Sequence, residues 1–144
     1  MRFKRVPIKK RSNKKKLRDE AGKIQLQILK LKRGPRCEFC RGPGSNIGRF
    51  HIIRVASAPR LEFVEENILL AHWMERCQAH YRWHHYGANA PECAAIEARI
   101  KELRGDNYYA DLMAREKFMG KHDELYLLAR IGELKKELKK LEEK

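Results

Sequence analysis

Two short motifs combine cysteine and histidine at the spacing of metal ligands. Cys37 and Cys40 are separated by two residues, and Cys77 and His80 repeat that spacing further along the chain. Structural zinc sites take four thiolate or imidazole ligands, two from a tight turn and two from a distant segment. The sequence therefore predicts one structural zinc ion held by these four side chains. A pair formed by His72 and Cys77 is the alternative source of the second two ligands.

Histidines are concentrated in one segment of the chain. Four of the six histidines, His72, His80, His84 and His85, lie within residues 72–86. A neutral imidazole can accept a proton or bind a metal ion near neutral pH. If zinc took His72 instead of His80, then His80 and His84 would form a pair on one face of a helix, because residues four apart share a face. This segment could therefore hold a second cation as well as zinc.

The remaining cysteine and the apolar content support a structural metal. Cys93 stands beside Ala94, Ala95 and Ile96 and is expected to be a small core residue. Residues 36–86 contain few large apolar side chains, and zinc can contribute on the order of 10 kcal/mol to the folding of such a module. Close cysteine pairs bind metals in reducing compartments more often than they form disulfides.

Positive charge is concentrated at one end of the chain. The whole sequence has 33 Lys and Arg against 19 acidic residues, a net charge of +14. Residues 1–33 contain 14 Lys or Arg and two acidic residues, so they carry +12 of that total. Basic runs such as 9–11 and 14–16 are typical of segments that contact the phosphates of nucleic acids. A solvated basic tail is the alternative interpretation.

Helical periodicity flanks the cysteine and histidine segment. Residues 14–33 are predicted to form a helix that Gly34-Pro35 ends, whereas residues 1–13 are expected to be unstructured. A helix is predicted from Pro91 to Gly105, another from about 106 to 118, and a third from about 123 to the end. The last helix has a heptad-like seam that could join two copies of the chain or pack within one. The seam consists of Leu127, Ile131, Leu134, Leu138 and Leu141.

The middle of the chain reads as short strands joined by turns. Residues 50–55 are predicted to form a strand that carries His51. Residues 58–66 are expected to be a loop or an irregular second strand, and another ordered segment begins at Asn67. Trp73 and Trp83 are expected to fill the core around the zinc ion.

Taken in this order, the motifs resemble the HNH endonuclease family and, within it, the NinG-type phage recombination proteins. The likeness spans roughly residues 24–110. The segments that carry it are Cys37-x2-Cys40, Phe50-His51-Ile52-Ile53-Arg54, Arg60-Leu61-Glu62-Phe63-x2-Glu66-Asn67 and Cys77-x2-His80-x3-His84-His85. The resemblance implies an α+β fold with a small zinc-stabilised ββα-metal core, flanked by an N-terminal basic helix and C-terminal helices. The expected parts are residues 1–35, 36–90 and 91–144.

The resemblance also implies a role for each reactive residue. His51 would be the general base that activates water, and Asn67 would orient the loop or the histidine. His84 and His85 would hold a catalytic cation, Mg²⁺ or another divalent ion, that is separate from the structural zinc. Many family members have an acidic or histidine ligand directly before the base, where this chain has Phe50.

The function implied is metal-dependent hydrolysis of DNA phosphodiester bonds, on recombination or branched intermediates. A non-catalytic zinc-finger protein that binds nucleic acids is the alternative, and a structural protein that dimerises through its last helix is a third. The chain has no apolar stretch near the ~18 residues that span a bilayer and no apolar segment typical of a secretory signal. The expected location is therefore the cytoplasm, that of a bacterial host cell if the chain is phage-encoded.

Overall fold

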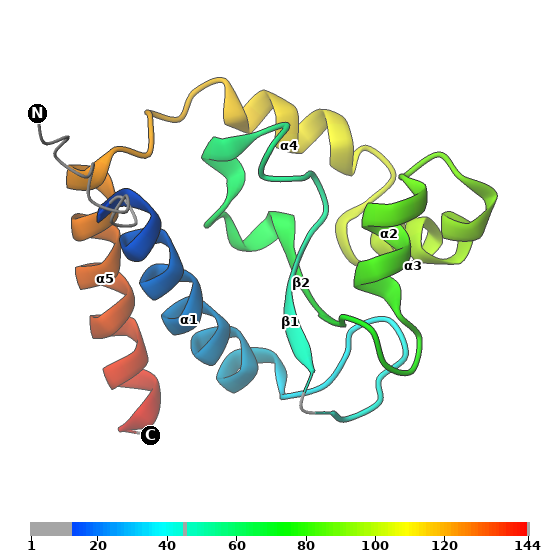
Figure 1. Ribbon diagram of the computed structural model, residues 1–144, viewed down its shortest axis with the longest axis horizontal. Helices are drawn as coiled ribbons and strands as arrows, with labels where there is room; N and C mark the ends of the chain where they lie inside the picture. The colour runs from blue at the N-terminus through cyan, green and yellow to red at the C-terminus, as the bar shows by residue number, and fades with distance from the viewer. Residues whose placement is uncertain (1–12, 45, 144) are drawn as a thin grey trace, which may run out of the picture.

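The computed structural model describes residues 13–44 and 46–143. Helices surround a small two-stranded sheet, and the predicted α+β class is confirmed (Figure 1). The basic run 9–11 and nearly all of the segment expected to be unstructured, 1–13, lie outside the described residues. In the described part of the chain, no helix combines the length and the apolar character that a membrane crossing requires.

The sheet is one antiparallel strand pair. Strand β1 (Ile47–His51) pairs with β2 (Ile68–His72), so that His51 lies opposite Ile68 and Ile47 lies opposite His72. Every residue of β2 is buried, because the chain covers both faces of this short ribbon. The register places the ends of the two strands, with one histidine each, at opposite ends of the sheet.

Five helices make up most of the rest of the described structure. They are α1 (Asn13–Arg33), α2 (Ala79–Tyr86), α3 (Ala94–Arg104), α4 (Tyr108–Glu116) and α5 (Glu124–Glu142). Gly34 and Gly105, with φ angles of +89° and +96°, follow the last residues of α1 and α3. Glycine is favoured there because this backbone region strains other residues. The helices predicted from periodicity are thus confirmed within a few residues at each end.

The strand predicted over 50–55 is too long, because β1 ends at His51. Beyond that point the side chain of Asn67 replaces a partner strand. Its Oδ1 accepts a hydrogen bond from the Ile53 N–H at 2.8 Å, and its Nδ2 donates to the Ile53 carbonyl at 3.1 Å. A fully buried amide that satisfies both main-chain groups ends the ladder without leaving them unpaired.

Helices α1 and α5 lie side by side and run in the same direction (Figure 1). The buried cluster between them consists of Ala21, Ile24, Ile28, Leu127, Ile131 and Leu134 from the two helices, together with Phe63 from the segment before β2. The remaining two seam residues, Leu138 and Leu141, are partly buried against the same cluster. The leucine seam therefore packs against the chain's own first helix, which is one of the two uses that the sequence left open. Dimerisation through α5 stays a prediction.

A second core connects the sheet to α2 and α3. Phe50, Trp83 and Cys93 are buried in it, so the expected core positions of Trp83 and Cys93 are confirmed. The indole N–H of Trp83 donates to the Ile52 carbonyl at 2.9 Å, which anchors α2 to the segment after His51. The core position expected for Trp73 is wrong: its side chain is 43% exposed.

Candidate metal centre and histidine cluster

Three thiols and one imidazole converge beside the end of β2. The ligand atoms of Cys37, Cys40, His72 and Cys77 all lie within 4.8 Å of one another. The Sγ atoms of Cys37 and Cys77 are 3.6 Å apart, and His72 Nδ1 lies 3.3 Å from Cys40 Sγ and 3.8 Å from Cys77 Sγ. In a tetrahedral site with Zn–S bonds of about 2.3 Å, ligand atoms are about 3.8 Å apart. The donor set and its spacing fit a zinc ion.

The fourth member of this cluster corrects one expectation. His80, predicted to be a zinc ligand with Cys77, lies outside the cluster. Its Nε2–H donates to the Arg49 carbonyl at 3.1 Å instead, from the first turn of α2. His72 takes the place among the ligands, as in the alternative pairing, because β2 ends with its side chain directed at the thiols.

Hydrogen bonding prepares His72 for this role. The imidazole is fully buried, and its Nε2–H donates to the Pro43 carbonyl at 3.1 Å. That bond fixes the tautomer in which Nδ1 carries the lone pair directed at the cysteines. A main-chain carbonyl on the far nitrogen is the usual partner of a metal-binding histidine, because it sets the orientation of the ring.

The turns that present the cysteines contain backbone of an uncommon kind. Arg41 follows Cys40 with a φ angle of 61°, and Arg76 and Gln78 flank Cys77 with φ angles of 53° and 51°. Residues other than glycine rarely adopt positive φ, and such strain persists only where the surroundings fix the conformation. A bound ion that ties both turns together would provide that constraint.

The electrostatics of the thiols also favour a cation. Burial, together with the neighbouring thiol of Cys37, raises the pKa of Cys77 to about 12. Burial acts to raise the pKa of Cys40 as well, but the Gly42 N–H and the adjacent thiols outweigh it and lower that pKa to about 7. Three thiolates this close repel one another, and a divalent cation would favour their ionised form.

We expect His72→Ala to lose zinc and His80→Ala to retain it. Removing a direct ligand should weaken zinc binding by more than the roughly 10- to 100-fold that loss of an outer hydrogen-bonding partner costs. Zinc per chain, measured by mass spectrometry on dialysed protein, would be near one for the wild type and His80→Ala. The two variants are matched, since each removes one imidazole. If His80→Ala lost zinc and His72→Ala retained it, His80 would be the ligand instead.

Three further histidines, called the histidine cluster below, lie near enough to one another to influence each other's charge. They are His51, the last residue of β1, and His80 and His84 from α2. The ring centroids of His80 and His84 are 4.7 Å apart. Among the described residues, neither His80 Nδ1 nor His84 Nε2 has a hydrogen-bond partner, although both atoms are buried. Two buried, unpartnered imidazole nitrogens are what a pair of metal ligands would present.

His51 is held in the form that accepts a proton. Its Nε2–H donates to the Glu62 carbonyl at 2.9 Å, so the lone pair is on Nδ1. Burial lowers the pKa of His51 to about 4, with nearby Arg49 and His84 acting in the same direction. Burial likewise lowers the pKa of His80 to about 3. These imidazoles are therefore neutral at pH 7, the form that can act as a base or a ligand.

The other two residues expected at the reactive site lie apart from these rings. Asn67 bonds to the main chain of Ile53 and so orients the loop that follows His51 instead of the imidazole itself. His85 is exposed, and its ring stacks on Tyr81 with centroids 5.0 Å apart. Of the two histidines expected to hold a catalytic cation, only His84 lies beside His80.

Two residues around His51 were given no role by the sequence. Glu62 supplies the carbonyl that orients His51, and its carboxylate pairs with Arg18 at 2.8 Å. Arg49 donates to that same carbonyl at 3.2 Å and to the buried amide of Gln25 at 2.9 Å. A main-chain acceptor leaves no signal in residue type, and a half-buried arginine has no pattern that marks it.

Comparison of the chain with protein-family models, with curated proteins and with solved structures found no match in any of the three.

Proposed function

We propose that this chain is a metal-dependent DNA endonuclease of the HNH type, in which zinc is structural and His51 is the general base. The observation that carries the proposal is the histidine cluster. His51 presents a proton-accepting nitrogen, and the two histidines that interact with it electrostatically, His80 and His84, each hold one unpartnered nitrogen. His51 ends β1, His80 and His84 lie on α2, and β2 stands between these elements in the chain, which gives the order strand, strand, helix expected of a ββα-metal core.

Each side chain of the cluster has a definable task in hydrolysis. His51 Nδ1 would accept a proton from a water molecule as the water oxygen attacks phosphorus in line with the leaving oxygen. The P–O bond to the leaving group breaks, and that oxygen takes a proton from solvent water. The Glu62 carbonyl accepts the Nε2–H of His51 both before and after the ring gains its second proton. A divalent cation on His80 and His84 would stabilise the charge that develops on the phosphate and the leaving oxygen.

The charge of the chain supports a nucleic-acid substrate. Lys14, Lys15 and Lys16 lie in the first turn of α1, and the chain carries +14 overall. Displacement of counterions from DNA phosphates favours binding by such a surface. Arg54 follows the base by three residues, is exposed, and donates a hydrogen bond to the His84 carbonyl, so a cation also stands at the cluster itself.

A non-catalytic nucleic-acid-binding protein is the second candidate, and one observation favours it. Outside the zinc cluster, no group of three or more potential ligands comes together in the described residues. A cation on His80 and His84 would therefore depend on water and phosphate oxygens for its other ligands. The two candidates differ in whether the bound strand is cleaved.

The discriminating experiment is cleavage of linear and branched DNA with a series of divalent cations. Because imidazole nitrogens favour later transition metals over Mg²⁺, we expect Ni²⁺ or Co²⁺ to support nicking at lower concentration than Mg²⁺. His84→Ala should raise the cation concentration required, whereas the neighbouring His85→Ala should not. The products would be separated on denaturing gels. If the wild type cleaves no substrate with any of these cations, the non-catalytic candidate stands.

A further inference from the structure

Glu62, whose main-chain carbonyl holds His51, also lines a pocket of about 880 Å³. The start of α1, the segment 55–62 and the connection between α4 and α5 enclose it. The starts of α1 and α5 lie at the same end of the molecule (Figure 1). Its volume is within the roughly 300–1,000 Å³ of small-molecule sites and exceeds what one phosphate group would fill.

The lining of this pocket is basic, and its acids are already engaged. Glu62 pairs with Arg18 at 2.8 Å, and Glu116 lies 3.9 Å from Arg60. The third acid, Asp123, caps α5 by accepting the Tyr126 N–H at 2.8 Å.

Two exposed lysines in the lining are not neutralised in this way. Lys14 comes from α1 and Lys121 from the connection between α4 and α5. Within 13–44 and 46–143, no acidic side chain forms an ion pair with either. They are therefore available to an anion.

A buried histidine lines the same pocket without a polar partner. His122 is 8% exposed, and neither of its ring nitrogens has a hydrogen-bond partner in the described structure. Its ring stacks on Tyr126 with centroids 4.1 Å apart and lies 5.9 Å from Phe63. Leaving a buried polar group unsatisfied costs about 1–3 kcal/mol. Whichever nitrogen carries the proton would gain a partner if it donated to an anion in the pocket.

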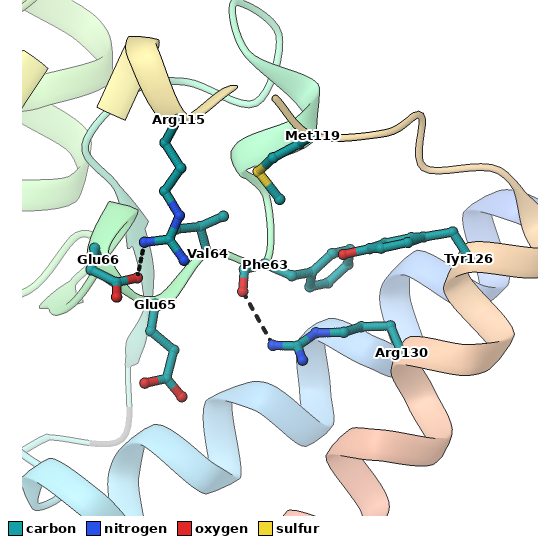
Figure 2. Close-up of a pocket in the computed structure, with 8 residues that line it drawn as sticks. All are labelled: Phe63, Val64, Glu65, Glu66, Arg115, Met119, Tyr126 and Arg130. Carbon is teal, nitrogen blue, oxygen red and sulfur yellow. Dashed lines mark hydrogen bonds and ion pairs between the residues drawn. The ribbon is translucent and has the colours of Figure 1, made fainter. Parts of the chain in front are cut away.

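A neighbouring pocket differs in that its basic side chains are already engaged. It is about 340 Å³, and the rings of Phe63 and Tyr126 line it. Both of its arginines are occupied: Arg115 pairs with Glu66 at 3.0 Å, and Arg130 donates to the Phe63 carbonyl at 3.5 Å (Figure 2). Neither arginine of this pocket is therefore free to bind a ligand, whereas the two lysines of the larger pocket are.

We infer that the larger pocket binds a phosphate group of a nucleic-acid strand, through Lys14, Lys121 and the ring of His122. The inference deepens the proposed function, since the strand would be the substrate. Glu62 connects the two places: its main chain accepts from His51, and its carboxylate and Arg18 line the pocket. A strand held here would therefore pass close to the base.

The test is DNA binding by the full chain without added divalent cation, so that binding is measured apart from cleavage. Lys14→Gln/Lys121→Gln is compared with Lys136→Gln/Lys140→Gln, which removes two exposed lysines of α5. Fluorescence anisotropy over a range of salt should show the slope of log K against log salt reduced by about 1–2 in the pocket variant only. His122→Phe keeps the ring but loses the donor, and it should weaken binding about tenfold.

Equal effects of the two lysine pairs, or full binding by His122→Phe, would overturn the inference. Inorganic phosphate provides a second arm, followed through the ring resonances of His122. Phosphate that shifts these resonances and competes with DNA supports a strand phosphate. If phosphate occupied the pocket while DNA binding stayed unchanged, the pocket would bind a free anion, and the inference that it binds a strand phosphate would be overturned. Neither readout depends on whether the protein cleaves, so failure here is distinguishable from failure of the endonuclease proposal.

Discussion

Replacing Cys37 and Cys40 with serine is expected to release zinc and unfold the centre of the chain. Binding of structural zinc contributes on the order of 10 kcal/mol in small modules, as much as the roughly 5–15 kcal/mol that stabilises a typical domain. The loss would spread into the sheet, because the turn that holds the two cysteines bonds directly to β2. There the Glu38 N–H donates to the Leu70 carbonyl at 2.7 Å. Zinc content and thermal unfolding followed by circular dichroism measure both effects.

Cys93→Ser is the matched control. Cys93 is fully buried, but it lies outside the metal cluster and donates a weak hydrogen bond to the Arg82 carbonyl, which serine can replace. This variant should keep one zinc per chain and a cooperative transition. If the double variant at Cys37 and Cys40 stayed folded with an unchanged melting temperature, the cluster would not be the structural metal site.

Loss of the His51 imidazole is expected to abolish cleavage and leave the fold intact. General base catalysis contributes about 10²- to 10⁴-fold, so the cleavage rate of His51→Ala should fall by that factor. Its zinc content and DNA affinity should match the wild type, because no thiol of the zinc cluster is touched. Rates come from single-turnover assays on the best substrate at a saturating cation concentration.

Chemical rescue separates a base from a structural histidine. Imidazole added to His51→Ala should restore part of the rate, since the small base can occupy the space that the substitution opens. His85→Ala serves as the control for a histidine outside the cluster, and imidazole should not change its rate. If His51→Ala cleaved DNA at the wild-type rate, His51 would not be the general base.

Local sequence patterns were sufficient for the parts of this protein that depend on neighbouring residues. The spacing of Cys37 and Cys40 predicts a metal-binding turn because two residues between thiols fit one ion. Helix periodicity located α1 and α5, and the glycines after α1 and α3 marked where those helices end. Each of these features is decided within a few residues along the chain.

The choice among the histidines depends on tertiary structure. His72 and His80 both stand near Cys77, and the more regular spacing favoured His80. The register of β2 makes His72 the zinc ligand, because its pairing with Ile47 fixes the direction of the His72 side chain. His84 and His85 are likewise equivalent in sequence, but adjacent helical residues face about 100° apart. The phase of α2 therefore brings only His84 beside His80.

The pairing of the first and last helices has a consequence during synthesis on the ribosome. The apolar side of α1 is complete at residue 33, whereas α5 begins about 90 residues later, at Glu124. At about 5–20 residues per second, roughly 5–20 seconds would pass between the synthesis of α1 and the start of α5, the helix that packs on its apolar side. During that time the side chains of Ile24 and Ile28 would be exposed to solvent on a strongly basic helix. Nascent chains are thus open to chaperones, or to misassociation through α1, until α5 has been synthesised.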